Sequence, residues 1–489
     1  MMNKTKKLLS AIVVCILMAT ALSTVAFAQS PIKVDVNGKE INLGAHQPYV
    51  VNDNVMMPLR AVSEALGANV SWDGENKNIT LLRGDNIYIM KEGKANVYAN
   101  GRVFKLSRAS EAKNNILYVP QDFIQAVFGF QPSYDDKSFR LSIKMKALPI
   151  HFSQSFRIEY MDDGSKLVTD GENMRLLLVP QGNEAPKGYK ADKIVRIPLK
   201  NAMCASSTQV GPLIKLGVLD SLKAVTTPGE KWVTAEVKAA FNQGKVKYVG
   251  GDGMGQPDYE LVKAVNPDMV FAYTGAYGQQ AMIDKLSEMG IGCAVNNEYL
   301  ESHYLGRMEW IKFMAAFYDK ELEAEKILND AVKEIDNVSI KIAGYKAPKI
   351  SWGNSNKGTV YVPNAGSYIG KWIDMAGGDY AFKNVGAGAA GSVKISMEDF
   401  YAQSKDADIL IYSSLITYLK NPTIEGLIEE NPLLADMKAV KNGDVWVYGA
   451  DWWETIPDTD RFIKDIASVF HPEAFKGYKG DKLIKLPRK

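Results

Sequence analysis

Two glutamates, far apart in the chain, stand in closely similar surroundings. "PDYELVKAVNPDMVFAYTG" at 257–275 places Glu260 at the start of a short helical stretch, then an aspartate and a continuous apolar strand, and "SMEDFYAQSKDADILIYSS" at 396–414 does the same with Glu398. A carboxylate in a first helical turn complements the helix dipole, and its fixed direction also suits pairing with an arginine. The recurrence indicates two similarly built halves.

Residues that could hold a metal or catalyse a reaction are scarce. The histidines are scattered, without His-x-x-His or Cys-x-x-Cys spacing, so free zinc or manganese is a poor candidate for the cargo. No G-x-S-x-G, H-E-x-x-H or plausible Ser/His/Asp set is present, which leaves little acid–base machinery. We therefore expect no enzyme activity, no metal centre and no cofactor. The histidines outside the N-terminal apolar segment are His46, His151, His303 and His471.

The composition is that of a globular protein in several domains. The chain has 489 residues, of which 46% are hydrophobic and 23% charged, with a formal net charge of +2. This length gives a prior of roughly three domains. Because the net charge is small, the sequence does not indicate nucleic acid or anionic lipid as a partner.

The first residues have the pattern of a secretory signal peptide, residues 1–28. Lysines precede an apolar run that ends in Ala-Phe-Ala, which predicts cleavage after Ala28. Cys15 lies inside the apolar run without a lipobox, so we expect no lipid on it. The sequence predicts a secreted protein at the cell surface, in the cell wall or in the periplasm. Only Cys204 and Cys293 would remain, which excludes a disulfide scaffold and leaves their pairing open.

An internal repeat marks a small α+β domain at residues 31–146. Residues 57–80 align with 119–142 at a constant offset, and each unit predicts a proline at a helix start, a short helix closed by glycine, and two strands around an aspartate turn. The matched pairs are Pro58 and Pro120, Gly67 and Gly129, Trp72 and Tyr134, and Asp73 and Asp135. This segment resembles the copper amine oxidase N-terminal-like stalk domain, without the catalytic part of such enzymes. A spacer or surface-attachment role is favoured.

The remainder predicts two α/β lobes joined by a long helix. After a hairpin pattern, apolar strands alternate with helices, as in parallel sheets covered by helices. The lobes are expected at 153–302 and 347–489, with connecting helices at 303–346 whose second part has apolar residues at helical spacing. About twenty residues there would form a rod of roughly 30 Å. The predicted strands are 193–200, 222–227, 268–273 and 292–297 in the first lobe and 349–354, 359–364, 407–414 and 443–449 in the second.

From about 153 to 489 the chain resembles a known family. The colinear pieces "TQVGPLIKLGVLDSLKAV", "PDYELVKAVNPDMVFAY", "YIGKWIDMAGGDYAF" and "NPLLADMKAVKNGDVWVYGADWW" are similar to helical-backbone substrate-binding proteins of ABC importers, which deliver ferric siderophores, haem and cobalamin. The resemblance implies a solute-binding component that captures an iron complex of siderophore type. It also implies partners: a permease of two transmembrane subunits with its ATPase, onto whose arginines Glu260 and Glu398 would dock. The alternatives are import of cobalamin or haem, and a surface adhesin or sensor that does not transport.

Ligand contacts are expected between the lobes, at the carboxyl ends of strands, where loops supply side chains and backbone donors. Aromatic walls suit a large planar or aromatic cargo, a metal chelate or a tetrapyrrole, although ordinary core packing is the alternative for each aromatic residue. Ferric citrate is disfavoured because 349–460 contains no arginine. Met203 or Cys204 could ligate a haem iron, against simple packing as the alternative. The ligand-binding candidates are Met203, Cys204, Ser206, Tyr273, Tyr277, Trp352, Tyr361, Trp452 and Trp453.

Overall fold

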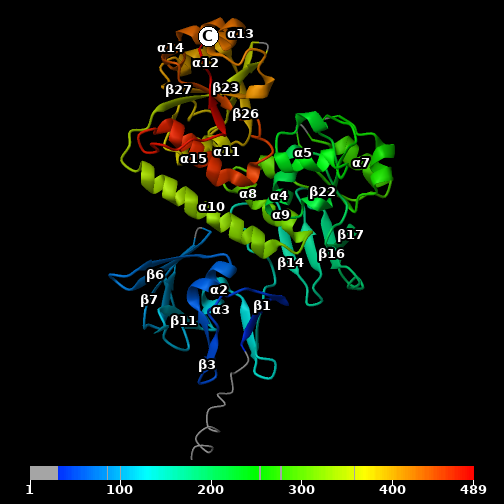
Figure 1. Ribbon diagram of the computed structural model, residues 1–489, viewed down its shortest axis with the longest axis vertical. Helices are drawn as coiled ribbons and strands as arrows, with labels where there is room; N and C mark the ends of the chain where they lie inside the picture. The colour runs from blue at the N-terminus through cyan, green and yellow to red at the C-terminus, as the bar shows by residue number, and fades with distance from the viewer. Residues whose placement is uncertain are drawn as a thin grey trace, which may run out of the picture.

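The computed structural model divides the chain into an N-terminal domain and two lobes that a long helix connects (Figure 1). It describes residues 31–84, 86–99, 101–252, 255–275, 278–356 and 358–488. The predicted signal peptide, with Cys15 and the cleavage position after Ala28, lies outside these residues. Within them, no helix is both long and apolar enough to cross a membrane.

The N-terminal domain is built from three small sheets and two short helices. The sheets have the strand orders β12-β13-β1-β2, β10-β11-β4-β3 and β5-β6-β7-β8-β9. The strands are β1 (Lys33–Val36), β2 (Lys39–Glu40), β3 (Tyr49–Val51), β4 (Asn54–Pro58), β5 (Asn69–Asp73), β6 (Asn78–Arg83), β7 (Asn86–Lys91), β8 (Asn96–Ala99), β9 (Arg102–Lys105), β10 (Glu111–Lys113), β11 (Ile116–Pro120), β12 (Gln131–Asp135) and β13 (Arg140–Lys144), and the helices are α2 (Leu59–Ala65) and α3 (Phe123–Phe128).

The two sequence repeats form the same succession of elements. The first is β4-α2-β5-β6 and the second β11-α3-β12-β13, and β4 pairs with β11 in antiparallel fashion, so the repeats meet through their first strands. Each predicted aspartate holds the turn after its strand: Asp73 Oδ1 accepts from the amide of Glu75 at 3.0 Å, and Asp135 Oδ1 from that of Lys137 at 3.0 Å. The repeat thus reflects a duplicated hairpin whose turn is stabilised by a carboxylate.

The first lobe carries a five-stranded parallel sheet of order β20-β19-β18-β21-β22. The strand predicted at 193–200 does not belong to it. That segment forms β17, which ends at Ile197 and pairs with β16 in a separate four-stranded sheet, whereas the central strand β18 is only three residues long. The elements are β14 (Arg157–Tyr160), β15 (Lys166–Thr169), β16 (Arg175–Pro180), β17 (Lys193–Ile197), β18 (Ala202–Cys204), β19 (Leu222–Val225), β20 (Lys247–Tyr248), β21 (Met269–Ala272), β22 (Cys293–Val295), α4 (Val210–Lys215), α5 (Ala235–Asn242), α6 (Tyr259–Val265) and α7 (Gln280–Glu288).

The second lobe has a mixed sheet of order β26-β24-β23-β27-β28-β29, with β25 paired to β23. The strands β23, β27 and β28 are parallel, as predicted, but β24 returns antiparallel to β23 instead of joining the parallel set. The elements are β23 (Lys349–Asn356), β24 (Thr359–Pro363), β25 (Asp379–Tyr380), β26 (Ser392–Ser396), β27 (Ile409–Leu415), β28 (Val445–Tyr448), β29 (Leu483–Lys485), α11 (Tyr368–Met375), α12 (Met397–Ser404), α13 (Ile424–Glu430), α14 (Lys438–Asn442) and α15 (Thr459–Phe470).

The aspartates that follow the paired glutamates start the first parallel strand of each lobe. Asp268 accepts from the amides of Lys200 and Asn201, both at 2.8 Å, just before β18. In the second lobe, Asp408 accepts from the amide of Lys349 at 2.8 Å, at the start of β23. Part of the recurrence in the sequence therefore serves the sheets themselves, because each carboxylate caps otherwise unpaired backbone donors.

The long helix α10 (Glu321–Ile342) passes from one hydrophobic core to another. Its early residue Ala324 belongs to the core shared by the N-terminal domain and the first lobe, whereas Leu328 and Ile335 belong to that of the second lobe. Two short helices, α8 (Gly306–Glu309) and α9 (Ile311–Ala316), precede it. The apolar spacing predicted this helix correctly, and 22 residues give it a length of about 33 Å.

A buried ammonium group joins these parts. Lys312 Nζ lies 2.9 Å from Glu309 Oε1 and 2.5 Å from Glu325 Oε2, and it donates to the carbonyl of Pro149 at 2.9 Å. Burial raises the pKa of Glu325, but Lys312 and His151 outweigh burial and bring it down to about 2. The carboxylate of Glu325 is therefore charged, and the ammonium group hydrogen-bonds Glu309 and Pro149 while it forms an ion pair with Glu325.

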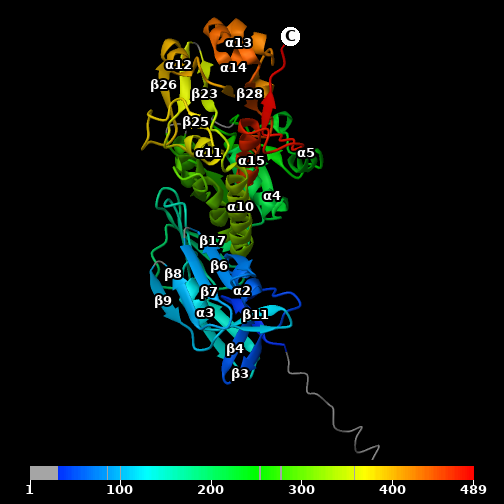
Figure 2. The ribbon, with the colours of Figure 1, turned by 90° about the vertical axis from the view of Figure 1, so that its left-hand side faces the viewer.

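The N-terminal domain docks on the first half of α10. Lys39 pairs with Glu323 at 2.8 Å, and Asn69 Nδ2 donates to the carbonyl of Asn329 at 2.9 Å. Leu199, three residues before β18, donates its amide to the carbonyl of Phe317, which follows α9. The helix therefore runs along the amino ends of the parallel strands, and the domain lies on that side of the lobes, as Figures 1 and 2 show.

We expect Lys312→Met to lower the free energy of unfolding by about 3–5 kcal/mol, because it leaves two buried carboxylates without their cation. The measurement is urea unfolding of the purified chain. The matched control is Lys326→Met, on the exposed side of α10, where the lysine side chain is 69% exposed and pairs with Asp330; its effect should be much smaller. Equal effects of the two substitutions would contradict this account.

Candidate ligand-binding cleft

The two lobes meet at the carboxyl edges of their parallel sheets. Helix α4 follows β18 and faces the segment after β28, so that a Cβ at Gly211 would lie only 2.6 Å from the carbonyl oxygen of Glu454. The Glu454 carboxylate accepts from the amides of Val233 at 2.8 Å and Thr234 at 2.7 Å, and Lys215 pairs with Asp458 at 2.5 Å. These contacts hold the lobes together at the edge where two-lobed α/β proteins bind ligands.

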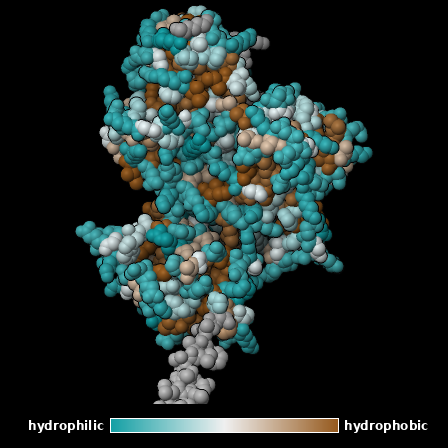
Figure 3. All heavy atoms as spheres, in the orientation of Figure 1, coloured by the Kyte–Doolittle hydropathy of each residue, from teal (hydrophilic) through white to brown (hydrophobic). Residues whose placement is uncertain are grey.

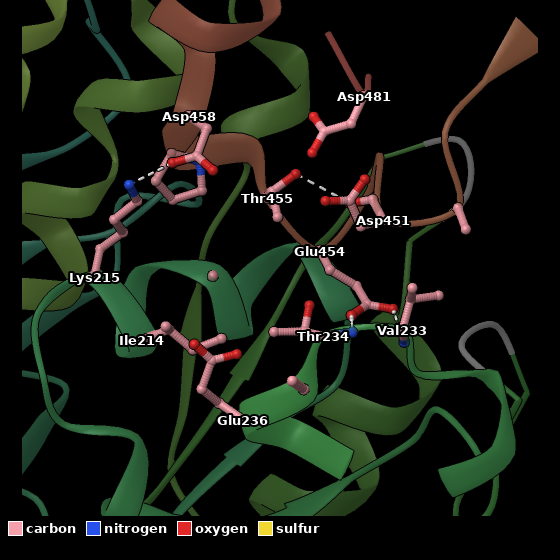
Figure 4. Close-up of a pocket in the computed structure, with 14 residues that line it drawn as sticks. Ile214, Lys215, Val233, Thr234, Glu236, Asp451, Glu454, Thr455, Asp458 and Asp481 are labelled. Carbon is pink, nitrogen blue, oxygen red and sulfur yellow. Dashed lines mark hydrogen bonds and ion pairs between the residues drawn. The ribbon is translucent and has the colours of Figure 1, made fainter. Parts of the chain in front are cut away.

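A pocket of about 620 Å³ opens beside these contacts and is lined by both lobes (Figure 4). Figure 4 shows Glu454 reaching from the second lobe to the backbone of Val233 and Thr234, with Lys215 and Asp458 on the other side. The volume is within the range of small-molecule sites. The pocket is therefore a candidate part of the ligand cleft.

The pocket is acidic. Among its described lining residues, Lys215 is the only basic side chain, against five carboxylates. Most of these are held by partners: Asp451 pairs with the fully buried Lys482 at 2.6 Å, and Asp481 pairs with Arg461 at 2.5 Å. Such a lining has no surplus of positive charge to hold a strongly anionic solute. The carboxylates are Glu236, Asp451, Glu454, Asp458 and Asp481.

Amide side chains fix the loops at the carboxyl edge of the first lobe. Gln209 Oε1 accepts from the amides of Ala205 at 3.1 Å and Ser206 at 3.2 Å, and Gln279 Nε2 donates to the carbonyl of Ala205 at 2.7 Å. The predicted ligand residue Ser206 caps the following turn, since its hydroxyl accepts from the amide of Thr208 at 3.3 Å, and its side chain is partly exposed. This edge is thus preorganised by buried hydrogen bonds.

The three tryptophans predicted in the second lobe converge around one tyrosine. Trp452 stacks on Tyr448 at 3.9 Å, Trp352 Nε1 donates to the Tyr448 hydroxyl at 2.8 Å, and Trp453 meets the Tyr448 ring edge-on at 6.0 Å. Trp352 and Trp452 are fully buried, whereas Trp453 is partly exposed. The indole N–H of Trp452 has no hydrogen-bond partner within the described residues. Only Trp453 of the three therefore has ring surface open to a solute in this conformation.

The sulfur-containing candidates lie inside the first lobe. Met203 and Cys204 are neighbours on β18, are 0% and 1% exposed, and belong to different cores on the two faces of the sheet. Burial raises the pKa of the Cys204 thiol well above its usual range. Cys204 and Cys293 are both free and buried, so they do not form a disulfide. A haem iron could reach neither Met203 nor Cys204 without opening the lobe.

The remaining predicted positions are spread over both lobes. Tyr273 is partly exposed beside Tyr299, with ring centroids 5.8 Å apart, and burial raises the pKa of Tyr273. Tyr361 is partly exposed on β24, where the Lys394 ammonium lies 5.6 Å from its ring centroid. Tyr277 lies outside the described residues. Tyr361 and Tyr273 thus do not join the tryptophan cluster.

The paired glutamates occupy equivalent, exposed positions. Glu260 is the second residue of α6, whose N-cap Asp258 accepts from the amides of Glu260 and Leu261. Glu398 is the second residue of α12, whose N-cap Ser396 accepts from the amide of Asp399. Helix α12 starts directly after β26, and α6 follows β20 after a ten-residue loop. Both helices thus lead away from the carboxyl end of a strand, which places both carboxylates towards the carboxyl edge.

The sequence did not single out the contacts that join the lobes. Glu454 is not among the residues predicted from the sequence, yet it is 6% exposed and bound to the backbone of the other lobe. A signal was present, because an acidic residue directly after two tryptophans needs a partner if they are buried. In the described part of the chain, no cluster of three His, Cys, Asp or Glu side chains is arranged to hold a metal ion.

Comparison with known families assigns both parts of the chain. The copper amine oxidase N-terminal domain matches residues 35–143, and the periplasmic binding protein family matches residues 203–452. Both predicted resemblances are thereby confirmed. The second family binds solutes and is not an enzyme family, which confirms that part of the prediction as well.

Relatives of known sequence agree with this assignment. An uncharacterized lipoprotein of Methanocaldococcus jannaschii is 32% identical over 338 residues, 65% of this chain and 78% of that protein. A Bacillus subtilis lipoprotein, provisionally named as an ABC transporter substrate-binding protein, is 24% identical over 245 residues, 48% of this chain and 74% of the lipoprotein. The Fe(3+)-citrate-binding protein of the same organism is 24% identical over 228 residues, 45% of this chain and 67% of that protein. The chain belongs to the periplasmic binding protein family and carries a copper amine oxidase N-terminal domain ahead of its two lobes.

Proposed function

We propose that the protein is the extracellular solute-binding component of an ABC importer and that it captures an iron complex of siderophore type. The observation that carries the proposal is the meeting of the two carboxyl edges over an acidic pocket, with one exposed glutamate at the same helical position on each lobe. The names of the Bacillus subtilis relatives, one an ABC transporter substrate-binding lipoprotein and one a Fe(3+)-citrate-binding protein, support the transport role and an iron cargo.

The charge of the pocket argues for a cargo without a large negative charge. Five carboxylates and one lysine line it, and Lys215, Lys482, Arg461 and backbone amides already pair with four of the carboxylates. The described lining therefore offers no unpaired cation to offset the charge of a citrate-rich complex. We therefore expect this chain to prefer a complex other than ferric citrate, although one relative is named for that ligand. Haem and cobalamin stand as the alternative cargoes.

Partly exposed residues at the carboxyl edge are the proposed cargo contacts. Ser206 and Tyr273 come from the first lobe, and Tyr361 and Trp453 from the second. Trp453 packs edge-on against the ring of Tyr448, and the buried ring of Trp452 stacks on the same tyrosine. The buried pair thus holds Trp453 in position. Tyrosine and tryptophan rings add contact area at low cost in side-chain entropy.

The proposed partner is a permease of two transmembrane subunits with its ATPase, which Glu260 and Glu398 would contact. Each carboxylate is fixed by the helix that bears it and can receive a bidentate arginine. The N-terminal domain lies along α10, at the opposite edge of the lobes, and so leaves both glutamates free of it. The proposed location is the cell surface, with the lobes facing the permease.

The first test identifies the cargo. Protein purified from its native host should carry an absorption band in the visible region that is typical of a ferric siderophore, and removal of iron by a chelator should abolish that band. If the protein instead showed the spectrum of haem or of a corrinoid, that compound would be the cargo and the siderophore assignment would be wrong. A colourless protein that binds none of these cargoes on titration would contradict the proposal.

A pair of tryptophan variants separates cargo contact from core packing. Trp453→Ala should lower affinity for the copurifying cargo by roughly tenfold, since it removes one stacking surface, with little change in melting temperature. Trp452→Ala should instead lower the free energy of unfolding by about 3–5 kcal/mol, as expected when a large buried ring is removed. Calorimetric titration and urea unfolding measure the two effects. Normal cargo affinity in Trp453→Ala would remove that residue from the site.

The docking role of the glutamates is tested by uptake. Glu260→Ala and Glu398→Ala should leave cargo affinity and melting temperature close to wild type and reduce uptake of the cargo at least tenfold, because truncating an interfacial charge pair costs about 2–5 kcal/mol. The matched control is Glu288→Ala, an exposed glutamate at the end of α7 near the opposite edge of the first lobe, which should transport normally. If both variants transport like wild type, or lose cargo affinity instead, the docking assignment is wrong.

A further inference from the structure

The N-terminal domain contains a pocket of its own, far from the cleft between the lobes. It has a volume of about 690 Å³ and lies between α2 and the β5–β6 hairpin of the first repeat and the β10–β11 hairpin. Nothing in the transport role of the lobes uses this pocket. Its size is sufficient for a small organic ligand.

The walls of the pocket are apolar and include an exposed tryptophan. Trp72 is 46% exposed although it is the largest side chain of the lining, whereas Ile79 on the neighbouring strand is 1% exposed and forms the floor. A large aromatic side chain that stays open to solvent at the mouth of a cavity is typical of a binding surface. The apolar lining consists of Pro58, Leu59, Ala61, Val70, Trp72, Ile79, Ala112, Ile116 and Leu117.

The second repeat, aligned residue by residue with the first, offers an internal comparison. In the sequence alignment of the repeats, Ala61 corresponds to Phe123, which is 0% exposed in the domain core, and Trp72 corresponds to Tyr134, which is partly buried. The first repeat therefore places a small residue on α2 and a large exposed ring on β5. Two positions that line this pocket thus differ in size between the two repeats.

Hydrogen-bonding groups surround the apolar floor. Arg60 pairs with Glu64 at 3.3 Å and donates to the carbonyl of Val70 at 2.5 Å, while Glu92, His46 and Asn115 complete the rim. The rim offers donors and acceptors, and its one arginine and two glutamates leave no excess of positive charge. This balance does not favour a phosphate or another anionic ligand.

We propose that this pocket binds a neutral saccharide chain. A sugar ring presents a face of C–H groups and a circumference of hydroxyls: the face would stack on Trp72, and the hydroxyls would bond to Arg60, Glu64 and Glu92. An anionic ligand would face the two glutamates, whereas the hydroxyls of a neutral sugar can donate to these carboxylates and accept from Arg60. The domain would then hold the lobes near an extracellular polysaccharide, independently of the cargo.

The test is calorimetric titration of the full chain with three neutral probes: chitotetraose, cellotetraose and maltotetraose. At least one should bind at one site per chain. Trp72→Ala, which removes the stacking surface, and Ala61→Phe, which adds a large ring to the pocket wall, should each weaken that binding about tenfold or more. Tyr134→Ala, the matched control in the second repeat, should bind like wild type, and melting temperatures identify any variant that fails to fold.

Several results would overturn the proposal. They are the absence of binding for all three probes, binding that Trp72→Ala and Ala61→Phe leave unchanged, and an equal loss in Tyr134→Ala. Binding of a heparin fragment or of an apolar octapeptide at this pocket, without binding of the neutral sugars, would assign the site to a different class of ligand and would equally reject the saccharide.

Discussion

The arrangement of the N-terminal domain and the two lobes depends on one buried interaction. The ammonium group of Lys312 lies between the carboxylates of Glu309 and Glu325 and is fully buried. Its partners belong to different segments: Pro149 precedes the lobes, Glu309 ends α8 and Glu325 lies on α10. Removing a lysine and two carboxylates from water is expensive, and the loss is recovered only if every donor and acceptor is matched. These segments therefore cannot separate without exposing an unpaired charge to an apolar interior.

The same carboxylates extend the arrangement to the neighbouring segments. Glu309 also accepts from the backbone amides of His151, Phe152 and Ser153, at 2.6–2.8 Å, and so fixes the chain that leads from the N-terminal domain into the lobes. Glu325 lies against Gly67, where a Cβ would come within 2.1 Å of its side chain. The N-terminal domain thus packs against the rest of the chain through specific contacts and is not joined to it by a flexible linker alone. On the face shown in Figure 3, hydrophilic residues cover much of the surface and apolar residues form separate patches.

Sequence patterns predicted the elements that have long or repeated signals. Helix α10 was recognised from its apolar spacing, β21 and β27 from unbroken apolar runs, and the duplicated hairpins from their alignment. The short central strand β18 was missed because three residues carry no periodicity, and β17 was placed in the wrong sheet because an apolar strand does not reveal its neighbour. Trp352 and Trp452 were predicted to face a ligand from their positions near strand ends, but burial depends on which way a chain turns after the strand. Acidic residues flank the tryptophan pair, but Asp451 pairs with Lys482, and Glu454 accepts from backbone amides of the other lobe, so both can lie beside a buried ring.

The way in which α10 is held has a mechanical consequence. Its first half is fixed to the N-terminal domain through Glu323 and Asn329, and its second half packs on α15, where Glu334 pairs with Lys464 at 2.6 Å. A helix that is held in both halves resists bending. A rotation of one lobe against the other therefore requires either a small bend of α10 or a change of backbone conformation in residues 343–348, which follow it. A stiff support of this kind allows small angular excursions and returns to one resting geometry. The distance between the lobes would then be set largely by α10 and the contacts that hold it. The same contacts would limit the range of solute sizes that fit between the lobes.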